Sequence, residues 1–227
     1  MNVSVVIPAF NEEKNIAKLI QSLLDQEESA DEIIVVDNNS SDETIQIVKR
    51  FPVRMVHESK QGITHARNKG FDEARYEIIA RADADTVLPT DWIKKIKNDF
   101  KKYKIDGLTG PIYYSETHSQ STFYSNLYSF LVNLMLGTPV LFGPNMAITK
   151  AIWDKVKKDI CLDDKRVHED IDISIHITRL GGKIFIDKTL AIPTSARRLY
   201  KTPWSFFIEY LIRLIRMTLD HRIFRKY

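Results

Sequence analysis

The chain has 227 residues, of which 44% are hydrophobic and 28% are charged, and it contains a single cysteine. This is the composition of a globular protein with enough apolar residues for a sizeable core, and one cysteine excludes an intrachain disulfide framework. The formal net charge of +3 is uneven, because residues 197–227 contain eight basic and two acidic residues. A basic tail on a mildly acidic body indicates an anionic partner, either a membrane or a nucleic acid.

The first hundred residues alternate between two patterns. Short β-branched runs predict strands at residues 2–8, 32–37, 52–58 and 76–83. Amphipathic stretches between them predict helices at residues 14–26, 41–51 and 62–74. The first helix would bury one face, formed by Ile16, Leu19, Ile20, Leu23 and Leu24. The second would begin at a capping Ser41 or Asp42. This alternation predicts βαβ units and a parallel sheet.

Polar residues follow three of the predicted strands at the point where each strand ends. They form the segments Phe10–Glu12, Asp37–Asn39 and Asp83–Asp85. Because ligands of such sheets bind beyond the carboxyl ends of the strands, we expect the three segments to border one site.

Asp83 and Asp85 are two carboxylates separated by a small residue. Two such groups in one pocket repel each other unless a cation lies near them. Mg²⁺ and Mn²⁺ prefer oxygen ligands and often bind one or two carboxylates together with substrate phosphates. The pattern therefore indicates a divalent metal, and a solvated pair of acids at a strand end is the alternative.

The segment Asp83–Val87 also fits the start of the haloacid-dehalogenase-like phosphatases, in which the first aspartate is a nucleophile. That class needs a later Gly-Asp motif, and this chain contains no Gly-Asp pair. A phosphatase is therefore the weaker alternative.

Six segments together resemble the family 2 glycosyltransferases, which have the GT-A fold. They span residues 5–16, 33–48, 62–74, 80–93, 141–156 and 167–186, and five of the motifs occur in the family's order and spacing. The resemblance covers about residues 1–195. It implies an α/β protein with a Rossmann-like, mostly parallel central sheet flanked by helices. Residues 1–110 would form the nucleotide-sugar-binding half and residues 111–196 the acceptor-binding half of the same domain, followed by a C-terminal amphipathic helix at 197–227.

The resemblance also implies how a nucleotide-diphosphate sugar would be held. Pro8 and Phe10 would line the nucleobase slot, and Glu12, with its neighbour Asn11, would close it. Asp37 and Asn38 would contact the base or the ribose, although the family often has a second aspartate where this chain has Asn38. Arg67 would lie near the diphosphate.

The resemblance assigns metal binding and catalysis to a second group of residues. By resemblance, Asp85 is the main ligand of Mg²⁺ or Mn²⁺, and Asp83 faces the ribose or the metal. Asp170 would be the general base that takes the proton of the acceptor hydroxyl, in a one-step displacement that inverts the anomeric carbon. Glu169 and Arg198 would lie on the acceptor or diphosphate side.

Two features leave more than one interpretation open. Glu169, Asp170 and Asp172 begin a predicted helix, where acids also favour the helix dipole without any catalytic role. His168 could touch the metal or the diphosphate, or it could be an ordinary hydrogen-bonded histidine.

The family's Gln-x-x-Arg-Trp motif is incomplete at residues 195–200, where Arg198 has no neighbouring Gln or Trp. This disfavours a processive polysaccharide synthase.

Two apolar stretches exceed what a nucleotide-sugar domain needs. Residues 121–142 lack charge but contain too many polar residues for a transmembrane span. Residues 204–227 combine a polar stripe with a wide apolar face, which predicts an in-plane helix at an anionic membrane surface. A helix packed on the domain's own core is the alternative. The dense apolar content of this tail argues against nucleic acid binding.

We therefore expect a metal-dependent, inverting glycosyltransferase of cell-envelope glycan biosynthesis. Its acceptor would be a glycan or a lipid-linked molecule at the inner face of the cytoplasmic membrane, and the lipid-linked acceptor is inferred from the two apolar stretches. The N-terminal run lacks the basic segment of a signal peptide. The sequence is also compatible with a soluble enzyme that acts on a saccharide or a protein. A nucleotide-sugar-binding module without activity is a further alternative, which the presence of Asp85 and Asp170 argues against.

Overall fold

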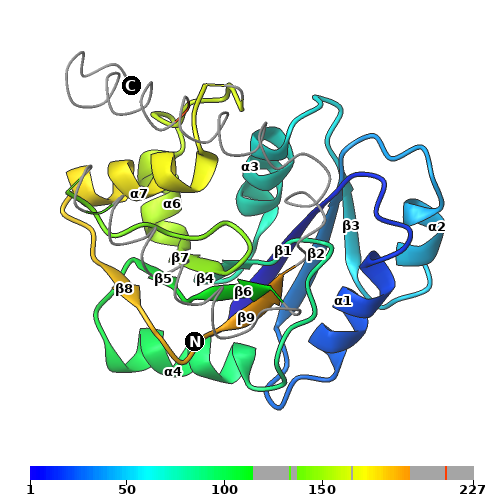
Figure 1. Cartoon of the computed structure of the whole chain (residues 1–227), viewed down its shortest axis with the longest axis horizontal. Coiled ribbons are helices and arrows are strands. Elements are labelled where there is room, and N and C mark those ends of the chain that lie inside the picture. The colour runs from blue at the N-terminus through cyan, green and yellow to red at the C-terminus, as the bar shows by residue number, and fades with distance from the viewer. Residues whose placement is uncertain (115–132, 134–136, 165, 195–212, 214–227) are drawn as a thin grey trace.

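The computed structural model describes residues 1–114, 133, 137–164, 166–194 and 213, and its centre is a seven-stranded sheet with helices on both faces (Figure 1). The strand order is β3-β2-β1-β4-β7-β5-β8. The strands are β1 (Val3–Ala9), β2 (Glu32–Asp37), β3 (Arg54–His57), β4 (Ile78–Arg81), β5 (Gly107–Thr109), β7 (Met146–Thr149) and β8 (Ile184–Ile186). Within this sheet β7 runs antiparallel to both of its neighbours, and the other pairs are parallel. The expected α/β architecture with a mostly parallel sheet is confirmed.

The helices of the first hundred residues lie where the periodicity predicts them. They are α1 (Ile16–Leu24), α2 (Thr44–Val48) and α3 (Ile63–Glu73). In α1 the predicted apolar face is buried except for Leu24, which is 39% exposed, because Ile16, Leu19, Ile20 and Leu23 already fill the stripe that faces the sheet. Helix α2 is much shorter than expected. The expected cap at Ser41 or Asp42 is wrong, because Glu43 is the residue that precedes the helix and it makes no capping hydrogen bond. Asp42 lies one residue earlier and accepts the backbone N–H of Thr44 at 3.0 Å.

Two apolar cores lie on opposite faces of the sheet. On one face α1, α2 and α4 (Trp92–Lys102) pack against residues such as Val5 and Ile7 of β1. On the other face α3, α6 (Lys150–Val156) and α7 (Glu169–Arg179) pack against residues such as Val6. A parallel sheet covered on both faces has nearly continuous apolar strands, which explains the unbroken run of β1.

Strand β7 joins the two expected halves of the domain. It comes from the second half of the chain but lies between β4 and β5, which come from the first half. The residue before it, Asn145, accepts a hydrogen bond from the Trp92 indole at 2.9 Å and donates one to the carbonyl of Leu190 at 2.6 Å. A second, two-stranded parallel sheet pairs β6 (Ile112–Tyr114) with β9 (Ile192–Thr194).

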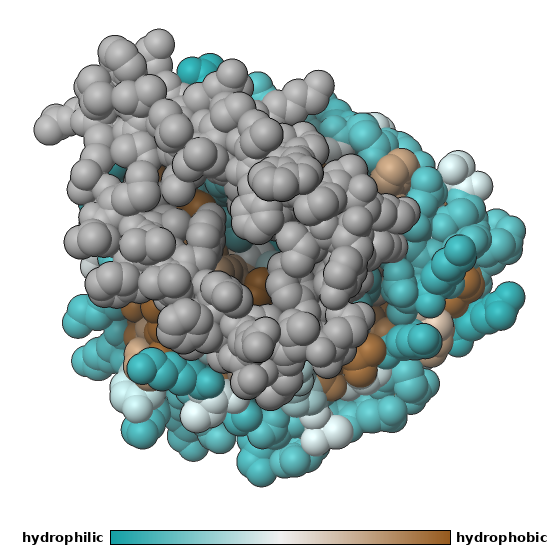
Figure 2. Space-filling view, in the orientation of Figure 1, coloured by the Kyte–Doolittle hydropathy of each residue, from teal (hydrophilic) through white to brown (hydrophobic). Residues whose placement is uncertain are grey.

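Most of the two apolar stretches lies outside the described residues, and so does Arg198. The predicted C-terminal helix therefore stays a prediction. Within the part of the chain that the structure describes, no helix combines the length and the apolar character needed to cross a bilayer. On the face shown in Figure 2, hydrophilic side chains cover much of the described surface, and hydrophobic ones show in small groups.

Candidate active site

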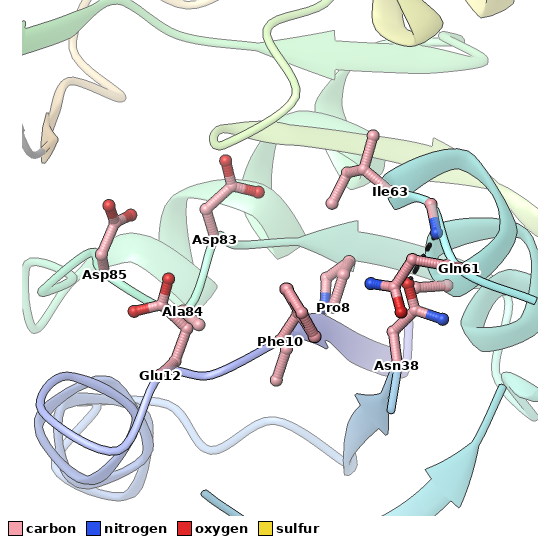
Figure 3. A pocket seen from close by; sticks show the side chains of 12 residues that line it. Pro8, Phe10, Glu12, Asn38, Gln61, Ile63, Asp83, Ala84 and Asp85 are labelled. Carbon is pink, nitrogen blue, oxygen red and sulfur yellow. Dashed lines mark hydrogen bonds between the residues drawn. The ribbon is translucent and has the colours of Figure 1, made fainter. Parts of the chain in front are cut away.

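A pocket of about 320 Å³ opens at the carboxyl edge of β1, β2 and β4. Six residues that the sequence predicts for the donor site line it: Pro8, Phe10, Glu12, Asn38, Asp83 and Asp85. The other lining residues are Ala9, Gln61, Gly62, Ile63, Ala66 and Ala84 (Figure 3). The three polar segments therefore border one site, as expected, and the start of α3 forms a further wall.

The turn after β1 shapes one wall of the pocket. Phe10 is 48% exposed although it is a large aromatic residue, and Pro8 lies beside it in the same lining. Between Phe10 and Glu12, Asn11 has a φ of 54°, a left-handed conformation that asparagine tolerates better than most residues. Its side-chain oxygen accepts the backbone N–H of Ser41 at 2.8 Å. This turn lets two nearby residues face the same pocket, one aromatic and one acidic.

The Asn38 amide holds the loop that follows β3. Its Nδ2 donates to the carbonyls of Glu58 at 2.9 Å and Lys60 at 2.7 Å, and its Oδ1 accepts the N–H of Gly62 at 2.8 Å. An ionised aspartate has no donor for these carbonyls. The loop contacts therefore give a physical reason for asparagine at this position.

Asp37 is buried and does not line the pocket. Its carboxylate accepts the N–H of Ser40 at 3.1 Å and lies 3.2 Å from Nδ1 of His57. These contacts support the turn after β2. The predicted contact of Asp37 with the base or the ribose stays a prediction.

The carboxylates of Glu12, Asp83 and Asp85 lie on one side of the pocket, away from Asn38 and Gln61 (Figure 3). No group of three or more His, Cys, Asp or Glu side chains arranged to hold a metal occurs among the described residues. Mg²⁺ and Mn²⁺ do not require one, because these ions accept one or two carboxylates and complete their shell with water and substrate phosphates. The donor set of Asp83 and Asp85 is entirely oxygen and fits such an ion.

Glu169, in the first turn of α7, lies between two buried arginines. One carboxylate oxygen pairs with Nη1 of Arg67 and the other with Nη1 of Arg81. Burial by itself would raise the pKa of Glu169, but the charges of Arg81 and Arg67 outweigh it, and the pKa is lowered. Glu169 is therefore an ionised ion-pair partner and a poor base.

Arg67 lies outside the lining of the pocket. Its side chain is fully buried, and its guanidinium lies 5.8 Å from the ring centre of Phe71 and 6.0 Å from that of Trp153. One amino group, Nη2, has no hydrogen-bond partner among the described residues. In this structure Arg67 supports Glu169, and its expected contact with the diphosphate stays a prediction.

Asp170 differs from the adjacent acid, Glu169. Its Oδ2 accepts the N–H of Gly143 at 3.0 Å, and its Oδ1 accepts the N–H of Ile171 at 2.9 Å. Burial raises the pKa of Asp170, and the negative charge of Glu169 raises it further. A carboxylate with a raised pKa is what a general base near neutral pH requires.

Asp172 and His168 are both buried at the start of α7. Asp172 is fully buried and accepts the N–H of Cys161 at 2.9 Å, which ties the loop before α7 to the helix. His168 is buried at the N-terminus of α7. Of the three acids in this turn, Asp170 has the surroundings best suited to proton transfer.

Sequence reasoning missed several residues at this site. Gln61 and Ile63 line the pocket, and Arg81 links the pocket to α7. Gln61 and Ile63 flank Gly62, at the start of a predicted helix on the sheet edge already selected, and that position is a usable signal. Arg81 carries no signal beyond its place at the end of a strand.

Residues 4–156 match the model of the family described as glycosyl transferase family 2. The match covers more than half of the chain, and the protein belongs to this family. Glycosyltransferase GlyG of Streptococcus pneumoniae is 30% identical over 128 residues, which are 54% of this chain and 42% of GlyG. A dolichol-phosphate mannosyltransferase of Pyrococcus furiosus is 32% identical over 102 residues, 42% of this chain and 29% of that protein. The chain thus spans less than half the length of these two relatives.

Solved structures of glycosyltransferases share the GT-A fold seen here. A mannosyltransferase from Pyrobaculum calidifontis, solved with GDP-Man and Mn²⁺, matches with a TM-score of 0.71 at 18% identity, over 98% of this chain and 70% of that one. TarS 1-349 of S. aureus matches with a TM-score of 0.66 at 21% identity, over 93% of this chain and 66% of that one. At these identities the likeness defines the fold alone. Together with the family match it excludes the phosphatase alternative.

Proposed function

We propose that this chain catalyses transfer of a sugar from a nucleoside-diphosphate sugar to an acceptor hydroxyl or phosphate, with inversion at the anomeric carbon. One observation carries the proposal: a single pocket joins an apolar wall, Pro8 and Phe10, to the carboxylates of Glu12, Asp83 and Asp85. A candidate base lies on α7, where Asp170 has a raised pKa. A nucleobase, a diphosphate with its metal and an acceptor proton each need one of these features.

The donor would lie along the pocket. Pro8 and Phe10 would hold the nucleobase, Glu12 would close the slot, and Asp37 would support the ribose side. Asp85 and Asp83 would hold Mg²⁺ or Mn²⁺, which supplies positive charge to offset that of the departing diphosphate. Among the structural neighbours, the P. calidifontis enzyme was solved with GDP-Man and Mn²⁺, and TarS of S. aureus with UDP-GlcNAc.

Asp170 would take the proton of the acceptor as its oxygen attacks the anomeric carbon. The bond from the acceptor oxygen to that carbon forms while the bond to the diphosphate breaks, and the nucleoside diphosphate leaves. Attack from the face opposite the leaving group inverts the carbon in one step. Glu169 would stay ionised between Arg67 and Arg81 throughout.

For the acceptor we propose a lipid-linked molecule, met at the inner face of the cytoplasmic membrane. The basic, apolar residues 197–227 support this, as does the similarity to a dolichol-phosphate mannosyltransferase. Arg198 would belong to the acceptor side. A soluble saccharide or protein acceptor is the other candidate.

The test is release of nucleoside diphosphate from a panel of UDP-, GDP-, ADP- and dTDP-sugars, with Mn²⁺, with Mg²⁺ and with a chelator. One donor should be consumed, and only when metal is present. Asp85→Ala should abolish this turnover, whereas Asp91→Ala, which removes a surface acid paired with Lys95, should not. Turnover that survives both the chelator and Asp85→Ala would contradict the proposed metal site.

A further inference from the structure

Arg81 joins two parts of the site that are far apart in the sequence. It is the last residue of β4, and its side chain is only 3% exposed. Its Nε and Nη2 donate to Oδ1 of Asp83 at 3.1 and 2.8 Å, and its Nη1 pairs with Glu169 on α7. One planar group therefore bridges the acidic side of the pocket and the turn that carries Asp170.

Gly143 touches both Arg81 and Asp170. A Cβ atom at this position would lie 3.1 Å from Nη1 of Arg81 and 3.2 Å from its Cζ and Nη2, so the backbone of Gly143 packs directly on the guanidinium. The N–H of Gly143 donates to Oδ2 of Asp170 at 3.0 Å. The absence of a side chain here permits the contact, and through it Arg81 and Asp170 share a neighbour.

We propose that Arg81 is a positioning residue that sets the orientation of the metal-binding carboxylate of Asp83 and, through Glu169 and Gly143, that of the base Asp170. The inference rests on the proposed function of the pocket. The guanidinium holds Oδ1 of Asp83, and the other oxygen, Oδ2, accepts no hydrogen bond from the described residues. A rigid fork of donors fixes a carboxylate more closely than a point charge does.

The informative variant is Arg81→Lys. It keeps the positive charge near Asp83 and Glu169 but loses the planar fork that reaches both. The probes are UDP and GDP, titrated into the protein by calorimetry with Mn²⁺ and with a chelator, alongside thermal melts. We expect Arg81→Lys to lower the Mn²⁺-dependent gain in nucleotide affinity about 10-fold or more, because losing a group that orients a metal ligand typically costs about 10–100-fold in metal affinity. Metal-free affinity should stay as in the wild type, because Pro8 and Phe10 are untouched.

Arg54→Lys is the matched control. Arg54 also bridges two carboxylates, since it pairs with Glu32 at 3.2 Å and with Glu73, but none of the three lines the pocket. The Arg54→Lys variant should change the melting temperature at most, and should leave the Mn²⁺-dependent gain in nucleotide affinity unchanged. Gly143→Ala is the second test variant, because its methyl group would press on the Arg81 guanidinium without removing any charge.

The outcomes separate the inference from the proposed function. The positioning role of Arg81 is supported if Arg81→Lys and Gly143→Ala lose the Mn²⁺-dependent gain in nucleotide affinity and Arg54→Lys keeps it. A full gain in Gly143→Ala, or in a folded Arg81→Lys, overturns it even where the melting temperature falls. If wild-type protein gains no affinity from Mn²⁺ for either nucleotide, the proposed metal site is wrong, and the positioning role of Arg81 falls with it.

Discussion

Glu169 and Asp170 are adjacent carboxylates whose pKa values move in opposite directions. Burial acts on both, but at Glu169 the charges of Arg81 and Arg67 outweigh it and lower the pKa. At Asp170 the charge of Glu169 adds to burial and raises the pKa. Two acids in one helical turn are thereby given different roles, one as an ion-pair partner and one as a candidate base.

The first prediction concerns the base itself. Asp170→Asn keeps the size of the side chain and can still accept the N–H of Gly143, but it cannot take a proton at neutral pH. Turnover should fall by about 10²–10⁴-fold, the usual contribution of a positioned base. Calorimetry should show nucleotide binding close to that of the wild type. Undiminished turnover would move the base to another residue.

The second prediction is a pH effect at Glu169. A base acts when deprotonated, so activity should rise with pH through the pKa of Asp170, which lies above that of an ordinary aspartate. Glu169→Gln removes the negative charge that helps to raise this pKa and leaves two arginines uncompensated nearby. The acidic limb of kcat/KM should therefore move to lower pH. Glu73→Gln, at the ion pairs with Arg54 and Lys69 outside the pocket, is the control and should leave the limb in place. A limb that stays fixed in Glu169→Gln would argue against Asp170 as the titrating group.

Much of the fold could be predicted because the first four strands are long enough to show a pattern. Strands β5, β6, β8 and β9 have three residues each, too few for any period to emerge. Nothing local in Met146–Thr149 indicates that it runs antiparallel between β4 and β5, because strand order is decided by contacts across the whole chain.

At the site, the residues at strand ends could be predicted because the edge of a parallel sheet brings them together. The partners of those residues could not. Arg81 and Glu169 are 88 positions apart, and their ion pair depends on how α7 packs on the sheet. Asn38 could be placed at the pocket from sequence, but only the structure reveals that its amide is engaged by the loop after β3.

The third prediction concerns that amide. Asn38→Asp would place a carboxylate against the carbonyls of Glu58 and Lys60, which now accept hydrogen bonds. Loss of two buried donors should destabilise the fold by about 1–3 kcal/mol and loosen the wall that contains Gln61 and Gly62. Urea unfolding measures the first effect and nucleotide titration the second. Asn39→Asp is the control, because Asn39 is exposed and should cost less. Equal stability of the Asn38→Asp variant and the wild type would show that the loop does not depend on this amide.

The fourth prediction is a pH dependence of stability away from the site. Burial raises the pKa of Asp99 to about 6, and the nearby Asp187 carboxylate contributes. Because this pKa is higher in the folded than in the unfolded chain, folding binds a proton between about pH 4 and 6, and stability falls as pH rises through that window. Asp99→Asn should therefore be more stable than the wild type at pH 8 and similar to it below pH 4. The difference at pH 8 should be only about 1–2 kcal/mol, because solvent screens part of the interaction at this partly exposed carboxyl. Chemical unfolding at both values measures the difference. If Asp99→Asn exceeds the wild type in unfolding free energy by the same amount at both pH values, the cause is packing and not the titration of Asp99.

The fifth prediction concerns the basic tail. If residues 204–227 bind a bilayer interface, truncation after Thr202 should release the protein from anionic liposomes without lowering the melting temperature of the domain. Added salt should also weaken binding of the full chain, because headgroup attraction is screened over a Debye length of about 8–10 Å. A tail packed on the domain's own core predicts the reverse, since loss of several buried apolar side chains would destabilise the fold by several kcal/mol, on the order of 2–5 for each large one. Liposome flotation and a thermal melt of the same truncated protein separate the two. Unchanged flotation with a collapsed melt would remove the membrane interpretation of this segment, and with it the main support for a lipid-linked acceptor.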